Sequence, residues 1–97
     1  MITKWIEFQV KEEAINIFAG VMAGMEYESR LEQGCVLYAA YQSKNDDAVF
    51  TVLESWANED DFEAHRQSDH LKAFKSQCGD MILKKRALEL NSLTKEK

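Results

Sequence analysis

Four stretches of the chain have the hydrophobic pattern of β-strands. Three of them alternate apolar and polar residues, which is the two-residue period of a strand with one buried face: Ile2–Val10, Ala48–Trp56 and Arg86–Ser92. The stretch Cys35–Gln42 is apolar at most positions, which predicts a strand covered on both faces. In the first strand the two-residue period places Trp5 on one face and Phe8 on the other. In the third it places four residues on one face, namely Phe50, Val52, Glu54 and Trp56.

The segments between these strands have the three-to-four-residue spacing of amphipathic helices. A helix is predicted from Lys11 to about Ser29, with an apolar stripe of Ile15, Phe18, Met22 and Met25. Gly34 follows it and can take the positive φ that a helix exit often requires. Asn58 is predicted to begin a short helix that ends near Arg66. Ser68 is predicted to begin a further helix, whose buried stripe is Leu71, Phe74, Cys78, Met81 and Ile82.

The resulting order, β-α-β-β-α(α)-β, predicts an α+β fold of the ferredoxin-like type in a single domain, residues 1–97, with a fraying tail at 93–97. Such a fold covers one face of a four-stranded sheet with helices. The other face is expected to carry Trp5, part of the second strand and the aromatic residues of the third. Because large exposed apolar patches mark interfaces, we expect two copies to pair through these faces.

The composition of the chain argues against several classes of binding partner. The 97 residues include 17 acidic and 12 basic side chains, a net charge of −5, which argues against nucleic-acid binding. The one basic run, Lys84 to Arg86, is interpreted as a solvated helix end. No apolar stretch is long enough for a membrane span or a signal peptide, so a cytoplasmic location is expected. Cys35 and Cys78 lack metal-ligand spacing and are expected to be reduced, packed thiols, with no metal bound.

Four stretches carry a resemblance to a known family. They are Phe8-x-Val10, Glu32-x-Gly34-Cys35-x-x-Tyr38, Phe50-x-x-x-Glu54-x-Trp56 and Glu63-Ala64-His65-x-x-Ser68-x-His70-x-x-x-Phe74. In order and spacing the chain resembles the antibiotic biosynthesis monooxygenase family. The resemblance implies a homodimeric α+β barrel with a pocket between sheet and helices in each subunit. It also implies oxidation of quinols or polyphenols by O₂ without metal, flavin or haem.

The same family includes isomerases of small phosphorylated molecules and haem-degrading enzymes. The haem-degrading branch uses an Asn on the first strand, a Trp in the short helix and a haem-ligating His in the next helix. The corresponding positions here are Ile6, His65 and Lys75, and isoleucine and lysine cannot perform those roles. The resemblance therefore implies no haem and no other cofactor.

Three residues are candidates for acid–base chemistry, which cofactor-free oxygenation needs to form an electron-rich substrate anion. His65 and His70 are the two histidines, and their five-residue spacing is not that of a helical metal pair, so they are interpreted as separate groups. Each could instead cap a helix or pack at the rim of the barrel. Glu54 lies on an apolar strand face. It is either a base or, the interpretation favoured here, a buried hydrogen bond or salt bridge across the dimer interface, for instance to Arg30 or Arg86.

Aromatic residues could form a pocket for a planar ring. The candidates are Trp5, Tyr38, Tyr41, Phe50, Trp56 and Phe74, and for each one taken singly core packing is the favoured interpretation. Three functions remain open at this point. The first is a monooxygenase that acts on a small aromatic substrate with O₂. The second is an isomerase or tautomerase of a small oxygenated or phosphorylated metabolite, and the third is a non-catalytic dimer that binds a small ligand.

Overall fold

A four-stranded antiparallel sheet forms one layer of the molecule. The computed structural model describes residues 1–94 and orders the strands β2-β3-β1-β4. Their bounds are β1, Ile2–Val10; β2, Cys35–Gln42; β3, Val49–Trp56; and β4, Ile82–Leu90. Of the four strands, the central strand β3 has the most buried residues, and the edge strand β4 has none. This is the predicted ferredoxin-like α+β fold.

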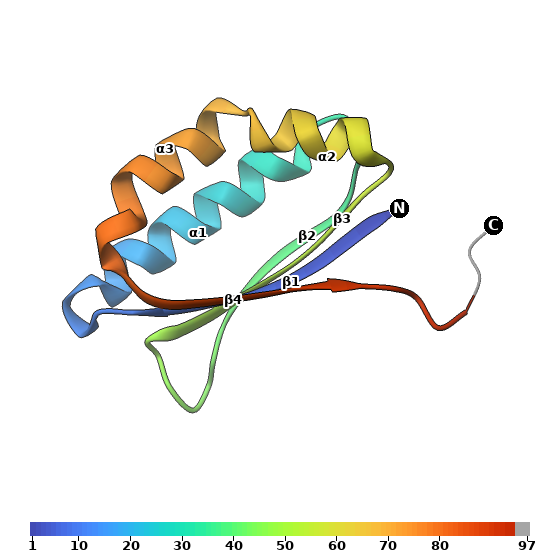
Figure 1. The fold of residues 1–97 in the computed structure, drawn as a ribbon. Helices are drawn as coiled ribbons and strands as arrows, with labels where there is room; N and C mark the ends of the chain where they lie inside the picture. Colours follow the sequence, from blue (N-terminus) through green and yellow to red (C-terminus); the bar gives the residue numbers. More distant parts are fainter. Residues whose placement is uncertain (95–97) are drawn as a thin grey trace.

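The helices form a second layer on one face of this sheet (Figure 1). Their bounds are α1, Ile15–Arg30; α2, Glu59–Arg66; and α3, Asp69–Cys78, with short 3₁₀ turns η1, Glu12–Ala14, and η2, Gly79–Met81. Helix α1 lies against β2 and α3. Both predicted caps are confirmed, since the side chain of Asn58 accepts from the Asp61 amide at 2.8 Å and Ser68 accepts from the Leu71 amide at 3.3 Å.

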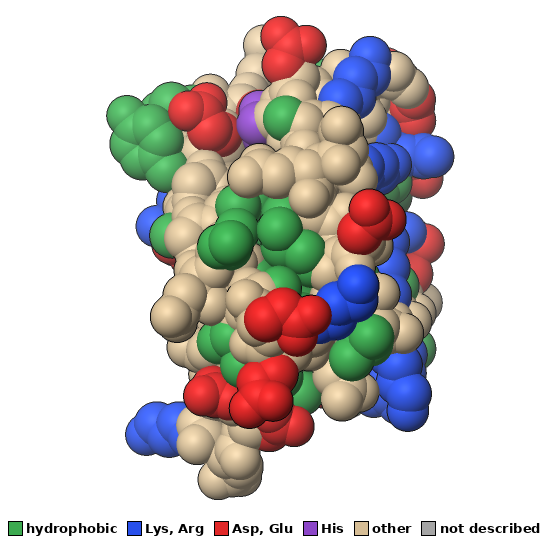
Figure 2. All heavy atoms as spheres, turned by 90° about the vertical axis from the view of Figure 1, so that its left-hand side faces the viewer, with side chains coloured by type: hydrophobic (Ala, Val, Ile, Leu, Met, Phe, Trp, Pro, Cys, Tyr) green, Lys and Arg blue, Asp and Glu red, His purple; other side chains and the backbone are tan. Residues whose placement is uncertain are grey.

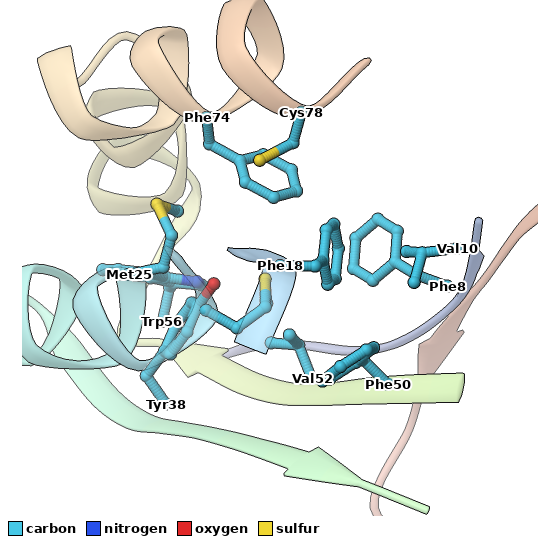
Figure 3. Close-up of a cluster of buried hydrophobic side chains, with 11 residues drawn as sticks. Phe8, Val10, Phe18, Met25, Tyr38, Phe50, Val52, Trp56, Phe74 and Cys78 are labelled. Atoms are coloured by element: carbon cyan, nitrogen blue, oxygen red, sulfur yellow. The ribbon is translucent and has the colours of Figure 1, made fainter. Parts of the chain in front are cut away.

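The core lies between the two layers and is centred on Phe18, which is fully buried. Its ring centroid lies 4.9 Å from that of Phe50 and 5.5 Å from that of Phe8. Phe74 points from α3 toward the same group, 5.8 Å from both Phe8 and Phe18 (Figure 3). The predicted stripe of α1 is confirmed, because Phe18, Met22 and Met25 are all buried.

The strand register divides the side chains between a covered and an open face. Phe8 pairs with Phe50, and Lys4 with Glu54, so these residues face the helices. Trp5 pairs with Leu53 and with Leu88 on the open face. The expectation that third-strand aromatics occupy the open face is wrong. Phe50 and Trp56 are buried on the covered face, since residues two apart in a strand share a side.

Large apolar side chains are exposed on the open face of this single chain. Leu37, Tyr41, Leu88 and Leu90 retain between 37% and 60% of their accessible surface. The helices of this chain therefore do not provide the cover expected on the open face of the second strand, where Leu37 and Tyr41 are exposed, and cover by a second copy stays a prediction.

The C-terminal boundary of the helical region differs from the prediction. α3 ends at Cys78, so Met81 and Ile82 are not part of its stripe, and Ile82 begins β4 instead. β4 begins at Ile82, four residues before the predicted start at Arg86. The basic run Lys84 to Arg86 therefore lies within β4 and not at a helix end. Backbone pairing with β1 over nearly its whole length extends the strand, since it satisfies amides and carbonyls that a polar sequence would leave to water.

Two local expectations concern the helix exit and the chain end. Gly34 has a φ of 82°, as predicted for the turn after the first helix. Of the predicted tail 93–97, residues 95–97 lie outside the described part of the chain. Among the helices of residues 1–94, none is both long and apolar enough to cross a bilayer.

Candidate functional site

A cavity of about 590 Å³ lies between α3 and the covered face of the sheet. Its apolar wall includes Phe8, Met22, Met25 and Phe74. His65 and Glu54, the two candidates for acid–base chemistry that reach it, also line the cavity. The cavity therefore combines an apolar interior with acid–base groups, which is the usual composition of a small-molecule site.

His65 is the most constrained polar side chain of the cavity. It is buried near the C-terminal end of α2, and its ring stacks on the indole of Trp56 with centroids 4.3 Å apart and planes 26° apart. Its Nδ1 lies 2.7 Å from Oε2 of Glu32, and its Nε2 lies 3.6 Å from Oε1 of Glu54. The ring is thus held by stacking on one side and by a carboxylate at one nitrogen.

Glu32 was not anticipated from the sequence as a functional residue. The same Oε2 that contacts His65 lies 2.6 Å from Nε2 of His70, so one carboxylate oxygen joins both histidines. The interpretation of His65 and His70 as separate groups is therefore wrong. Glu32 lies 33 and 38 positions before them, and only its place in the motif that includes Gly34 could have drawn attention to it.

This cluster also has the donor types of a metal site. The donor atoms of Glu32, His65 and His70 all lie within 4.8 Å of one another. However, both N···O distances are hydrogen-bond lengths, shorter than the separation of about 3.3 Å between tetrahedral ligands of a zinc ion. A metal would require the three side chains to move apart, whereas two N–H groups shared by one carboxylate fit the observed distances directly.

Glu54 lies in the middle of β3, buried beside His65. Its Oε1 accepts a hydrogen bond of 2.9 Å from the indole Nε1 of Trp56. The expected partners are elsewhere: the Arg30 guanidinium contacts Glu26 and the Tyr38 carbonyl, and Arg86 lies over the ring of Trp5 on the open face. Glu54 is therefore buried and hydrogen-bonded, but its hydrogen bond comes from Trp56 of the same chain, and neither Arg30 nor Arg86 of this chain contacts it. A contact of Glu54 across a dimer interface stays a prediction.

The hydrogen bond to Glu32 determines what His65 can do. A carboxylate oxygen 2.7 Å from Nδ1 keeps the ring proton at that nitrogen, since two bare acceptors would repel each other. Nε2 then carries the lone pair and can accept a proton. Once it has done so, the imidazolium lies between Glu32 and Glu54, whose negative charges stabilise it.

Tyr38 closes the cavity on the β2 side, with its ring centroid 5.9 Å from that of His65. Burial, with the charge of Glu54 as the second cause, raises the pKa of the Tyr38 phenol far above its ordinary value. The group therefore stays protonated and can donate a hydrogen bond, but it is not a base. Burial likewise raises the pKa of the thiols of Cys35 and Cys78, which disfavours the nucleophilic thiolate.

The other predicted aromatic residues divide between three locations. Tyr38 and Phe74 line the cavity. Trp56 lies behind His65 and Phe50 lies in the core, so both support the cavity without lining it. Trp5 and Tyr41 lie on the open sheet face, where the strand register points them away from the cavity. His70 does not line the cavity either, and it reaches the site through its contact with Glu32.

Solved structures share this fold over nearly the whole chain. A Pseudomonas aeruginosa protein superposes with a TM-score of 0.91 at 19% identity, covering 96% of this chain and 94% of its own. A Nitrosomonas europaea protein described as a candidate antibiotic biosynthesis monooxygenase gives 0.90 at 19% identity, covering 97% and 100%. A conserved Methanosarcina mazei protein gives 0.83 at 27% identity, covering 92% and 89%.

Sequence comparison gives the family directly. Among curated proteins, none matches this chain. The family model described as "Antibiotic biosynthesis monooxygenase" matches residues 1–77, which include β1 through most of α3 and every residue of the Glu32, His65 and His70 cluster. The chain belongs to the antibiotic biosynthesis monooxygenase family.

Proposed function

We propose that this protein is a monooxygenase that oxidises a small quinol-like or polyphenolic substrate with O₂, and that His65 is its general base. The observation that carries the proposal is the position of His65: it is buried, lines the cavity and is held by Glu32 so that Nε2 is free to accept a proton. Family membership supports the reaction class.

The chemistry begins with removal of a phenolic proton by Nε2 of His65, which leaves an electron-rich ring anion that O₂ can oxidise. In the balanced reaction, one atom of O₂ enters the ring, the other leaves as water, and the substrate loses two hydrogen atoms. Glu54 and Glu32 stabilise the imidazolium that forms, and Tyr38 can donate a hydrogen bond to a substrate oxygen. No cofactor takes part in these steps.

The proposal is tested by O₂ uptake with a panel of reduced naphthoquinols and anthrones. We expect uptake by the wild-type protein and a loss of at least about 100-fold in kcat for His65→Gln, the range expected when a general base is removed. A matched control is Gln67→Ala, which changes an exposed residue at the end of the same helix. If no substrate gives uptake above buffer, or if His65→Gln retains full activity, the proposal is rejected.

The pair of His65 and Glu54 in the cavity wall also helps to distinguish the proposed monooxygenase from an isomerase and from a non-catalytic binding dimer. A binding module does not need a buried imidazole next to a buried carboxylate, so the pair favours an enzyme over a non-catalytic dimer. The same pair could move a proton in an isomerase. Lys4 lines the cavity, so a cation is present for the phosphorylated substrate of such an enzyme. If the wild-type protein shows no O₂ uptake but exchanges substrate C–H protons with solvent, the isomerase is the correct function.

We also propose that the open face packs against a second copy of the chain to form a homodimer. The surface area of one chain, 6532 Å², exceeds the value of roughly 5,700 Å² expected for a compact monomer of 11.2 kDa. Trp5, Leu53 and Leu88 form the centre of that apolar face. Pairing two such faces removes from water the surface that the helices of one chain do not reach.

Sedimentation at micromolar concentration tests this assembly. We expect a species of about 22 kDa, twice the chain mass of 11.2 kDa. Leu88→Lys, which places a charge on the open face, is expected to give the 11.2 kDa species. Tyr27→Lys is the control, because Tyr27 is 65% exposed on α1, away from that face. A wild-type monomer, or equal dissociation of both variants, would exclude the proposed interface.

A further inference from the structure

Cationic side chains gather around the cavity although the chain as a whole is acidic. Lys4, Arg66, Lys75 and Lys85 line it, together with the single carboxylate of Glu54. The formal charge of the lining is therefore about +3 in a chain whose net charge is −5. Figure 2 shows lysine and arginine side chains gathered along one side of the molecule, at the right of the view.

These cations come from several elements that face one another. Lys75 lies on α3 and Lys85 on β4, so the two lysines approach the cavity from its helical wall and from its sheet wall. Arg66 ends α2 and Lys4 lies on β1. A helix surface or a strand edge often carries one solvated lysine, but four cations converging from four elements on one cavity are a property of the tertiary structure.

Most of these charges lack a carboxylate partner. Arg66 lies 3.5 Å from Glu63, with both side chains more than half exposed, and such a pair is worth little. Within residues 1–94, Lys4, Lys75 and Lys85 form no ion pair. The ammonium groups of Lys4 and Lys85 lie over the rings of Phe62 and Phe8, at 5.1 Å and 6.0 Å from the centroids. They are therefore available to an anion that enters the cavity.

Two of the four cations, Lys75 and Lys85, lie away from the acid–base end of the cavity, whereas Lys4 and Arg66 lie beside Glu54 and His65 at that end. Lys85 pairs with Phe8, and Glu54 pairs with Lys4 at the level of His65. Four residues of β1 separate the two levels, a distance of about 13 Å along the strand at about 3.3 Å per residue. A fused-ring molecule with a charged substituent spans such a distance, since lysine side chains reach inward from their backbone positions.

We propose that the substrate is an aromatic molecule with an anionic substituent, such as a carboxylate, which Lys75 and Lys85 bind while the ring end lies against His65. The proposal rests on the proposed function only for the direction in which the ring points. The anion site itself follows from the charges and the cavity. An aromatic ring also suits the apolar lining between the two ends, where Ile6 lies midway between Lys4 and Phe8 on β1 and Leu71 and Phe74 come from α3.

Calorimetric binding of two matched probes tests the anion site without any turnover. 2-Naphthoate carries the charge, and 2-naphthol has the same ring without it at neutral pH. We expect the wild-type protein to bind naphthoate at least about fivefold more tightly, and the difference to shrink in 0.5 M salt as screening increases. Lys75→Gln and Lys85→Gln should each weaken naphthoate binding by about two- to fivefold, the range of a partly exposed charge pair, and leave naphthol binding unchanged.

The control variant is Lys72→Gln, which removes an exposed lysine of the same helix that does not line the cavity. It should leave both affinities unchanged. Equal affinity for the two probes, no measurable binding of naphthoate, or an equal loss in Lys72→Gln would overturn the proposal. Naphthoate binding without O₂ uptake for any quinol, carboxylated quinols included, would reject the proposed oxygenase and leave the anion site standing.

Discussion

Replacement of Glu32 by glutamine tests whether one carboxylate organises the site. Its Oε2 lies 2.7 Å from Nδ1 of His65 and 2.6 Å from Nε2 of His70, and hydrogen bonds to a charged group contribute about 1.5–3 kcal/mol each. The side chains of Glu32 and His70 are 16% and 21% exposed, which lowers these values through solvent screening. Glutamine keeps one acceptor oxygen, and neutral hydrogen bonds are about half as strong as charged ones.

We therefore expect Glu32→Gln to lower the free energy of unfolding by about 2 kcal/mol. For a domain of this size, that loss lowers the melting temperature by roughly 8–16 °C. Urea denaturation at a fixed protein concentration measures the loss. Because the amide no longer selects the Nδ1–H tautomer of His65, kcat should fall by about 10-fold or more while KM changes little.

The matched control is Glu28→Gln, an exposed glutamate on α1, which should stay within about 0.5 kcal/mol of the wild type. A double-mutant cycle with His70→Gln separates the two hydrogen bonds, and the expected coupling is about 1 kcal/mol. A loss below about 0.5 kcal/mol for Glu32→Gln, equal to that of Glu28→Gln, would refute the role assigned to Glu32.

Three further predictions concern the frame of the site. Gly34→Ala should cost about 2 kcal/mol of unfolding free energy, because its φ is 82° and a Cβ there would meet the Asp61 carboxylate; adding Asp61→Ala should recover part of this loss, and full stability of Gly34→Ala would contradict it. Burial raises the pKa of the Tyr38 phenol above its unfolded value of 10.0. The folding stability that goes with the neutral phenol is therefore fully present below pH 10.0 and is lost as pH rises toward the folded pKa. Tyr38→Phe should therefore show a smaller fall in stability between pH 9 and pH 11, by about 1.4 kcal/mol in a pH-resolved denaturation series; parallel curves would contradict this. Ser68→Ala should cost about 1 kcal/mol in thermal melts, because its hydroxyl caps α3 and donates to the His65 carbonyl at 2.7 Å; an unchanged melting temperature would show that another group replaces the cap.

The elements and their faces could be predicted because each depends on residues close together in the chain. The alternation in the third strand correctly placed Phe50, Val52 and Glu54 on one face, and the spacing of Phe18, Met22 and Met25 correctly predicted the buried side of α1. The caps and Gly34 were also predictable, since a cap or a positive φ is a property of a few consecutive residues.

The errors share a cause in contacts between distant segments. The residues of 82–85 gave no clear strand signal, and they extend β4 because β1 offers them backbone partners. Arg30 and Arg86 were named as examples of a partner for Glu54 on charge alone, whereas the packing of α2 over β3 brings His65 to it. The aromatic residues of the third strand were placed on the open face because the identity of the covered face depends on where the helices pack.

The sequence by itself determined the order of elements, the residues that share a side within the third strand and the first helix, the caps and the family, because these follow from local periodicity, turn chemistry and motif spacing. Only the tertiary structure decided that Glu32 joins His65 and His70, that Glu54 faces the cavity and that cations from four elements surround it. Residues 33 and 38 positions apart meet through the packing of α2 and α3 over the sheet. No local pattern encodes such a meeting, since it depends on how whole elements bury their apolar faces against one another.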